Sequence, residues 1–330
     1  MMIMAFSKDP SDYRTLVRPD RRTSVETLVD EWVIRGPYRN PASISWEALR
    51  ALALDETDSL CIADGMRCAR FGHDVSRSYQ SLAPVSKKKL DANPHLAGQH
   101  LSVLEARVFG RCCERLGWIE FVRDDELDVI DARREFQRQS AVETDERKAA
   151  FGGLRDVDDL PAGTLELMVK ISHQVFVGML SVGTPLSSSD SETGTGWQRN
   201  LTCQSPTCFG GQYDAVVVGH HTGQRVLCDI KMVDHSVDAK SLIRFNPKNQ
   251  IQLLIYLLLV AMQDDIRDDE IPTGLAWVNP LRGVVEFVTA DVIIKNMDVI
   301  ERLASRALCL PDDVVEKVVE RLSGVLTATL

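Results

Sequence analysis

The chain has 330 residues, of which 38 are Lys or Arg and 48 are Asp or Glu, so its formal net charge is −10 at pH 7. Hydrophobic residues make up 44% and charged residues 26%, values that exclude a wholly disordered chain or a fibrous repeat. At roughly 100–200 residues per domain, this length predicts one large domain or two. The acidity argues against a protein that coats nucleic acid over its whole surface, but it leaves room for a local basic groove.

The apolar residues predict no membrane span. The longest apolar run, Leu253 to Met262, has 10 residues, whereas a spanning helix needs roughly 20. The N-terminus has a short apolar start followed by Asp9 and Asp12, which is not typical of a secretory signal. The eight cysteines are scattered, which is typical of reduced thiols. We therefore expect an intracellular protein, cytoplasmic or nuclear, that is neither secreted nor membrane-bound.

The first half of the chain is predicted to be mostly helical. Residues 1–22 are polar and charged and are interpreted as a flexible lead, and residues 23–160 as a mostly helical N-terminal region. The strongest helix is expected over Leu101 to Leu116, where apolar residues recur at helical spacing and Gly117 provides a stop. A strand is expected next, over Trp118 to Val122. Further helices are expected over Ser24 to Val33, Ser45 to Leu54 and Gly163 to Leu180.

The second half, which we assign to residues 161–330, is predicted to be mixed α/β. Its strands follow a Ser- and Gly-rich loop over Leu186 to Asn200. Gly324 is expected to end the last helix. The expected strands are Tyr213 to Val218, Gln224 to Val233, Thr273 to Val278 and Val284 to Val288, and the expected helices are Asn249 to Met262, Ala290 to Leu308 and Asp312 to Leu322.

Three charged residues interrupt the apolar strands of the first predicted hairpin. Asp214, Asp229 and Lys231 require an explanation, because charged side chains are seldom buried without a partner. A turn centred between His221 and Thr222 places Asp214 directly opposite Asp229, with Cβ atoms roughly 4.5–5.5 Å apart. Alternation along the strand then puts Lys231 on the same face as Asp229.

Two interpretations of this hairpin remain open. A divalent cation between the two carboxylates would relieve their repulsion, and carboxylates with carbonyls or waters are ligands that suit Mg²⁺ or Mn²⁺. Alternatively, Lys231 simply neutralises the acids in a salt-bridged hairpin. The next predicted helix favours the first interpretation, because Gln252 and Tyr256 lie one turn apart on an otherwise aliphatic helix and would share one face.

This ordered set resembles the PD-(D/E)xK nuclease superfamily. Gly211-x-x-Asp214, then Asp229-Ile230-Lys231, then Gln252-x-x-x-Tyr256 is closest in order to the RecB-type exonucleases, and the matching span runs from about Gly211 to Val288. Tyr213 stands where many members have Pro. The resemblance implies a restriction-endonuclease-like core, α/β or α+β, in which a mixed central sheet is flanked by helices, here over residues 161–330.

The resemblance also implies an acidic residue from a helix before the hairpin. Glu166, Glu105 and Glu114 are the candidates, and we favour Glu166 because it lies in the nearest upstream helix. His173 lies on the same predicted helix and is interpreted as a surface or packed histidine.

The resemblance assigns roles to the remaining residues. Asp214, Asp229, the backbone carbonyl of Ile230 and Glu166 would hold Mg²⁺ or Mn²⁺, and Lys231 would act on the attacking water. Gln252 would orient the lysine, the water or a phosphate, and Tyr256 would support the substrate strand or pack. In the loop before the helix, three basic residues outnumber the single acid and are expected to contact phosphates. These residues are Lys240, Arg244 and Lys248.

The expected activity is that of a Mg²⁺-dependent, exonuclease-like enzyme acting on DNA in processing, repair or defence. One alternative is an RNA endonuclease of the cap-snatching kind, although no His is well placed as a metal ligand. Another is an inactive nuclease-fold module for nucleic-acid binding or assembly, and a third is a structural protein. We expect no iron–sulfur cluster, because only Cys309 follows the core, and the N-terminal helical region is a possible contact for a protein partner.

Overall fold

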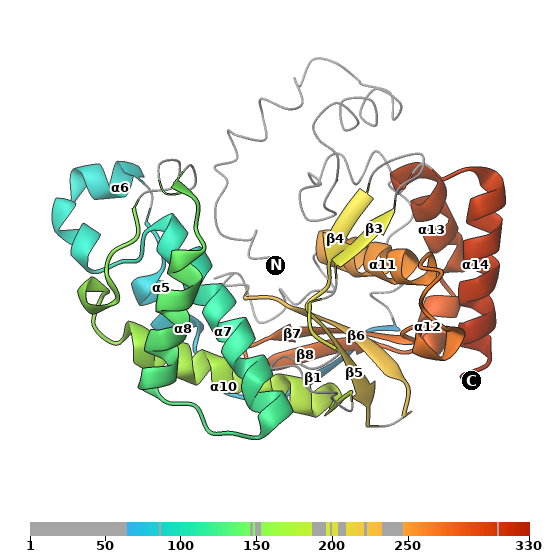
Figure 1. Ribbon diagram of the computed structural model, residues 1–330, viewed down its shortest axis with the longest axis horizontal. Coiled ribbons are helices and arrows are strands. Elements are labelled where there is room, and N and C mark those ends of the chain that lie inside the picture. The colour runs from blue at the N-terminus through green and yellow to red at the C-terminus, as the bar shows by residue number, and fades with distance from the viewer. Residues whose placement is uncertain are drawn as a thin grey trace, which may run out of the picture.

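The computed structural model of the protein describes residues 65–85, 87–145, 148, 153–186, 196–198, 200–203, 209–220, 223–232, 247–308 and 310–330. The helices expected over Ser24 to Val33 and Ser45 to Leu54, and the lead over residues 1–22, lie outside these residues. A six-stranded mixed sheet forms the centre of the described part, with helices on both faces (Figure 1).

The sheet has the strand order β1-β8-β7-β6-β5-β2. β6 and β7 are parallel, and the other neighbours are antiparallel. A separate two-stranded sheet pairs β3 with β4. The strands are β1 (Arg67–Arg70), β2 (Gly183–Pro185), β3 (Asn200–Cys203), β4 (Phe209–Gln212), β5 (Ala215–Gly219), β6 (Arg225–Ile230), β7 (Gly274–Asn279) and β8 (Val284–Val288).

Two groups of helices flank the sheet (Figure 1). One group comprises α5, α6, α7, α8 and α10, and the other comprises α11 to α14. Their bounds are α5 (Ser76–Leu82), α6 (Lys87–Ala92), α7 (Val103–Arg123), α8 (Val129–Ala141), α10 (Thr164–Val182), α11 (Pro247–Ala261), α12 (Ala290–Ile294), α13 (Met297–Arg302) and α14 (Asp312–Thr327). Short 3₁₀ turns cover Pro94–Gly98, Val157–Asp159 and Asp268–Glu270, and a π-helical turn covers Leu303–Ala307.

Alternation along the strands divides the core into two faces. On β6, Cys228 and Ile230 pack with α7 and α10. Leu227, which points the other way, packs with α11. Asp229 has the same parity as Leu227, so it lies on the face that α11 covers.

Helix α10 is long and apolar enough to cross a membrane, the only described helix that is. It packs against α7 and against the sheet, and its Val175 and Met179 belong to the core shared with the strands. This is the position of a buried core helix.

The expected end of α7 at Gly117 and the expected strand over Trp118 to Val122 are wrong. α7 continues through both to Arg123, because Trp118 and Phe121 complete its buried face and join the core. Gly117 lies where α7 meets α10, and a Cβ there would be 2.4 Å from the carbonyl oxygen of Ser172. The glycine therefore permits close helix packing instead of stopping the helix.

Two further boundaries differ near the C-terminus. The single helix expected over Ala290 to Leu308 is divided at the buried Asn296, whose side-chain amide donates to the carbonyl of Val292. Gly324 lies inside α14, where Leu322 and Leu326 are fully buried. Their packing outweighs the roughly 1 kcal/mol that an interior glycine costs a helix.

Candidate functional site

The hairpin of β5 and β6 has the register expected from its turn. Ala215 pairs with Cys228, so Asp214 and Asp229 follow as the next opposed positions. The backbone N–H of Ile230 donates to Asp214 Oδ2 at 2.8 Å, a buried bond that holds this carboxylate at the end of the hairpin. In addition to burial, the charge of Asp214 raises the pKa of Asp229, as expected for two carboxyl groups that lie close together. The two acids therefore lie side by side, as the sequence predicts.

Lys231 lies beside this carboxylate pair. Its Nζ is 2.8 Å from Asp229 Oδ2, and the two side chains are only 5% and 1% exposed. Strand alternation explains the contact, because residues two apart on one strand point to the same face. The pair is therefore a buried ion pair, in which each charge depends on the other for its stability.

Helix α11 supplies the second wall of the site. Gln252 accepts a hydrogen bond from Lys231 Nζ at 3.2 Å. Tyr256, one turn later, is fully buried and makes hydrogen bonds to the Gln252 side chain and the Gln212 backbone. Burial raises the pKa of Tyr256, and the nearby carboxylates of Asp229 and Asp214 act in the same direction. The tyrosine is therefore a neutral hydroxyl that fixes Gln252, which in turn fixes Lys231.

Glu114 of α7 is a third buried acid, and the charges of Asp214, Asp229 and Lys231 act on its pKa. It is 1% exposed, and neither of its carboxylate oxygens has a hydrogen-bond partner among the described residues. Burial raises its pKa well above the usual range for a glutamate. The charge of Asp214 raises it further, while that of Lys231 opposes the shift.

The other two upstream candidates lie elsewhere. Glu166 is exposed in the first turn of α10, in contrast to the almost complete burial of the carboxylates at the hairpin. Glu105 is buried, but it forms the capping box of α7 with Ser102 and accepts hydrogen bonds from Arg155. The role of Glu166 therefore stays a prediction, and the burial of Glu114 near the charges of Asp214 and Lys231 makes Glu114 the stronger candidate for the upstream acid.

A sequence signal for Glu114 exists in the spacing of two glycines. Gly110 and Gly117 lie four residues before and three residues after Glu114; both are buried, and Gly117 is where α7 packs closely on α10. At helical spacing, residues i−4 and i+3 share a face with residue i. Glu114 therefore lies on a buried stripe of small residues, where an acid needs a partner or a ligand.

Burial also raises the pKa of Asp229, to about 7. Lys231 lowers this pKa, while the charge of Asp214 raises it. Near neutral pH Asp229 is therefore partly protonated when no cation balances its charge.

The donor chemistry of the cluster suits a hard divalent cation. Carboxylate oxygens are the ligands that Mg²⁺ and Mn²⁺ prefer, and Glu114 brings two buried oxygens with no partner among the described residues. In the part of the chain that the structure describes, no three His, Cys, Asp or Glu side chains are arranged as a ready metal-ligand group. Cation binding at Asp214, Asp229 and Glu114 would therefore require these side chains to adjust.

The expected phosphate contacts cannot be located. Lys240 and Arg244 lie outside the described residues, and Lys248 is described only as part of the backbone of α11. The role expected of the Ile230 carbonyl likewise stays a prediction, since the contact that the structure shows for Ile230 is made by its N–H.

No family model, no curated protein and no solved structure matches the chain.

Proposed function

We propose that the protein is a Mg²⁺-dependent nuclease that hydrolyses phosphodiester bonds, with DNA as its substrate. The observation that carries the proposal is the buried cluster of Asp214, Asp229 and Lys231 at one end of the sheet, whose charges also act on the buried Glu114. Burying several carboxylates beside one lysine is costly, and such arrangements are concentrated at functional sites.

The fold supports membership of the PD-(D/E)xK superfamily. A mixed sheet with helices on both faces is what a restriction-endonuclease-like core requires, and the acids and lysine lie at the open end of its β5–β6 hairpin. The helix with Gln252 and Tyr256 follows this hairpin in the chain and packs over the same face. The motif order and the spatial order therefore agree.

Each residue of the site has a chemical task. Asp214, Asp229 and Glu114 would hold the metal ion, which when bound polarises a phosphoryl oxygen and lowers the pKa of a coordinated water. Lys231 Nζ, held by Asp229 and Gln252, presents a cationic proton donor to the developing charge on the phosphate. Gln252 and Tyr256 are positioning residues, because they act through Lys231.

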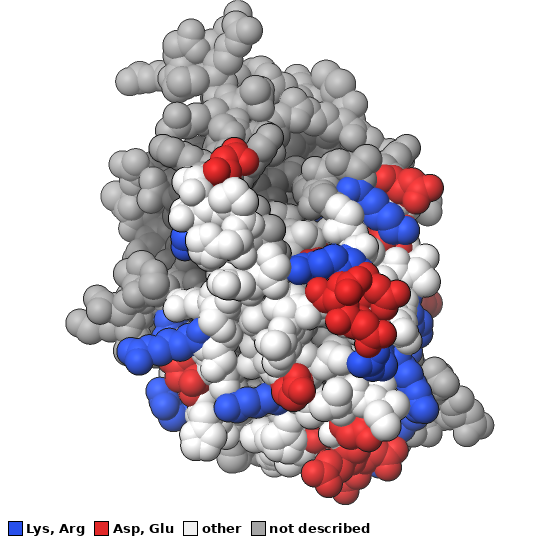
Figure 2. Space-filling view, turned by 90° about the vertical axis from the view of Figure 1, so that its left-hand side faces the viewer, with Lys and Arg blue, Asp and Glu red and all other residues white. Residues whose placement is uncertain are grey.

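Charge on the rest of the molecule is consistent with a local substrate site. Figure 2 shows the face formed by the helices at the left of Figure 1, where basic and acidic side chains are interspersed. Ion pairs such as Arg133 with Asp158 and Arg138 with Glu135 tie charges together on and beside α8. The described residues of this face therefore form no broad basic surface of the kind that binds a phosphate backbone.

The test is a cleavage assay on end-labelled single-stranded DNA, duplex DNA and RNA, with Mg²⁺ or with EDTA. Asp229→Asn and Lys231→Met are expected to reduce Mg²⁺-dependent DNA cleavage at least about a hundredfold. Asp264→Asn and Lys317→Met change exposed residues of the same types and should retain activity. Cleavage that survives Asp229→Asn would refute the assignment, and a folded protein that cuts none of the three substrates would be an inactive member of the fold. Preferential cleavage of RNA would contradict the choice of DNA.

A further inference from the structure

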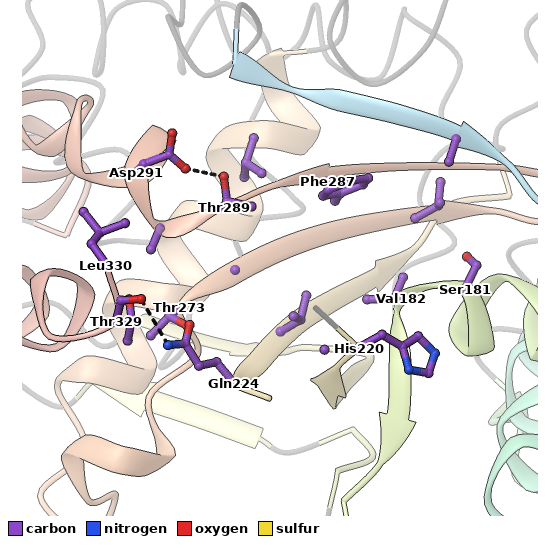
Figure 3. Close-up of a pocket in the computed structure, with 17 residues that line it drawn as sticks. Ser181, Val182, His220, Gln224, Thr273, Phe287, Thr289, Asp291, Thr329 and Leu330 are labelled. Atoms are coloured by element: carbon purple, nitrogen blue, oxygen red, sulfur yellow. Dashed lines mark hydrogen bonds between the residues drawn. The ribbon is translucent and has the colours of Figure 1, made fainter. Parts of the chain in front are cut away.

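A cavity of about 280 Å³ lies at the other end of the sheet from the carboxylates. Asp214 precedes β5, whereas Gly219 ends it and lines the cavity. At about 3.3 Å per residue, these two positions are roughly 16 Å apart. The cavity is therefore separate from the site proposed above, and it uses none of that site's residues (Figure 3).

Apolar side chains form most of the cavity wall. The strands contribute Val226, Val285 and Phe287, and the end of α10 contributes Val182. The edge strand β1 adds Ala69. The space is larger than the roughly 150 Å³ in which an engineered apolar cavity holds benzene. A ring or a branched alkyl group would therefore fit against these residues.

Several polar side chains of the wall already bind one another (Figure 3). Thr273 Oγ1 donates to Gln224 Oε1 at 2.9 Å, and Gln224 Nε2 donates to the backbone carbonyl of Thr329 at 3.4 Å. His220 Nε2 lies 2.7 Å from the carbonyl oxygen of Leu180. Because these polar side chains already have hydrogen-bond partners, the centre of the cavity suits an apolar ligand group.

One end of the cavity is negatively charged. Asp291 lines it and accepts a hydrogen bond from the hydroxyl of Thr289, which lowers the pKa of this carboxyl. No Lys or Arg is among the 17 lining residues. Asp291 also forms a loose ion pair with Lys295, whose Nζ is 3.8 Å from Asp291 Oδ2 and whose side chain is mostly exposed. The lining therefore favours a cation over an anion.

We propose that this cavity binds a small organic ammonium compound. Its ring or branched alkyl group lies against Phe287, Val226 and Val285, and its ammonium group lies at Asp291. The proposal is independent of the nuclease assignment, since either can fail without the other.

The experiment is ligand-observed saturation-transfer NMR on the full chain with three probes of similar size. Benzylammonium is expected to bind more tightly than benzyl alcohol, and phenylacetate to bind least. Asp291→Asn keeps the shape of the site and should weaken the binding of benzylammonium by up to about fivefold, the range of a partly exposed ion pair. The binding of benzyl alcohol should stay unchanged.

A cavity-filling variant provides the second arm. Ala69→Phe puts a ring into the cavity from an exposed position of an edge strand, where aromatic residues are well tolerated, and it should abolish binding of benzylammonium and benzyl alcohol. Arg70→Phe adds the same ring to β1 at a residue that does not line the cavity, and should leave binding intact. Equal binding of the three probes, binding that survives Ala69→Phe, or no binding at millimolar concentrations would overturn the proposal.

Discussion

Lys231 Nζ lies 2.8 Å from Asp229 Oδ2, and both side chains are almost completely excluded from solvent. A buried ion pair seldom stabilises a fold more than apolar residues of the same size would, because desolvation offsets the Coulomb attraction. The pair is therefore better explained by the chemistry of the site than by folding stability. A second carboxylate, Asp214, lies near the same acid and its charge adds to the effect of burial in raising the pKa of Asp229, which makes the arrangement still less favourable as a purely structural one.

Removing only one member of this pair should be strongly destabilising. Lys231→Met leaves Asp229 buried beside Asp214 without its cation, and we expect the free energy of unfolding to fall by about 3–5 kcal/mol. The double variant with Asp229→Asn should recover much of this loss, because the remaining charge is then removed as well. Urea unfolding of the two single variants and the double variant measures this coupling. Lys295→Met removes an exposed lysine of a loose surface pair and should change stability by less than about 1 kcal/mol.

Metal binding should stabilise the fold through the three acids. At a free Mg²⁺ concentration a hundred times Kd, the expected gain is about 2.7 kcal/mol, and EDTA should remove it. Glu114→Gln should abolish most of this gain while costing little stability without metal, because burial already favours the neutral form of this side chain. Thermal unfolding with and without Mg²⁺ gives the comparison.

Glu166→Gln provides the matched control for this measurement. Its side chain is exposed, so the metal-dependent stabilisation should match that of the unmodified protein. If Glu166→Gln removed the stabilisation and Glu114→Gln did not, the choice of upstream acid would have to be reversed.

The hairpin and its helix could be predicted from sequence because their signals are local. A tight turn fixes the pairing of the strands that it joins, so the opposition of Asp214 and Asp229 follows from counting away from the turn. The spacing of Gln252 and Tyr256 likewise fixes a shared helix face. Both inferences involve residues close together in the chain, so they can be made without knowledge of the tertiary packing.

The positions of Glu114 and β1 could not be predicted from sequence, because they depend on contacts between segments that are distant in the chain. Glu114 precedes Asp214 by 100 positions, and it is buried in a helix that packs closely on α10. β1 is a short, exposed edge strand that contains two arginines, so it lacks the apolar alternation that identifies a strand in sequence. α7 also extends beyond the predicted end at Gly117, because a glycine has the same local propensity at a helix end and in a close helix contact.

Gly117→Ala should test how α7 is held against α10. An added Cβ would lie 2.4 Å from the Ser172 carbonyl oxygen and 2.5 Å from Val175 Cβ, so the two helices must move apart. We expect a loss of about 1–3 kcal/mol of stability, and weaker Mg²⁺ binding because Glu114 lies one turn away. Denaturant unfolding and Mg²⁺ titration give the two measurements.

Gly324→Ala provides the matched glycine substitution. Its Cβ would meet no atom within 4 Å, so the change should stabilise α14 by about 0.5–1 kcal/mol and leave Mg²⁺ binding unchanged. A Gly117→Ala protein with normal stability and normal Mg²⁺ affinity would show that the α7–α10 approach is not as tight as the structure has it.

The acid side of the stability curve should depend on Glu105. Hydrogen bonds from Arg155 and from the Ser102 backbone outweigh the effect of burial, which by itself raises the pKa, so the pKa of Glu105 is lowered on folding. A carboxyl with a lowered folded pKa contributes its stability above the unfolded value, near 4.5, and loses it as the pH falls through the folded value. Glu105→Gln should therefore cost about 2–3 kcal/mol at pH 7, and this difference from the unmodified protein should shrink below about pH 4.5.

Urea unfolding between pH 7 and pH 3 measures the difference, with Asp145→Asn at a fully exposed position expected to leave the curve unchanged. A gap between Glu105→Gln and the unmodified protein that stays constant down to pH 3 would show that the ionised Glu105 does not stabilise the fold.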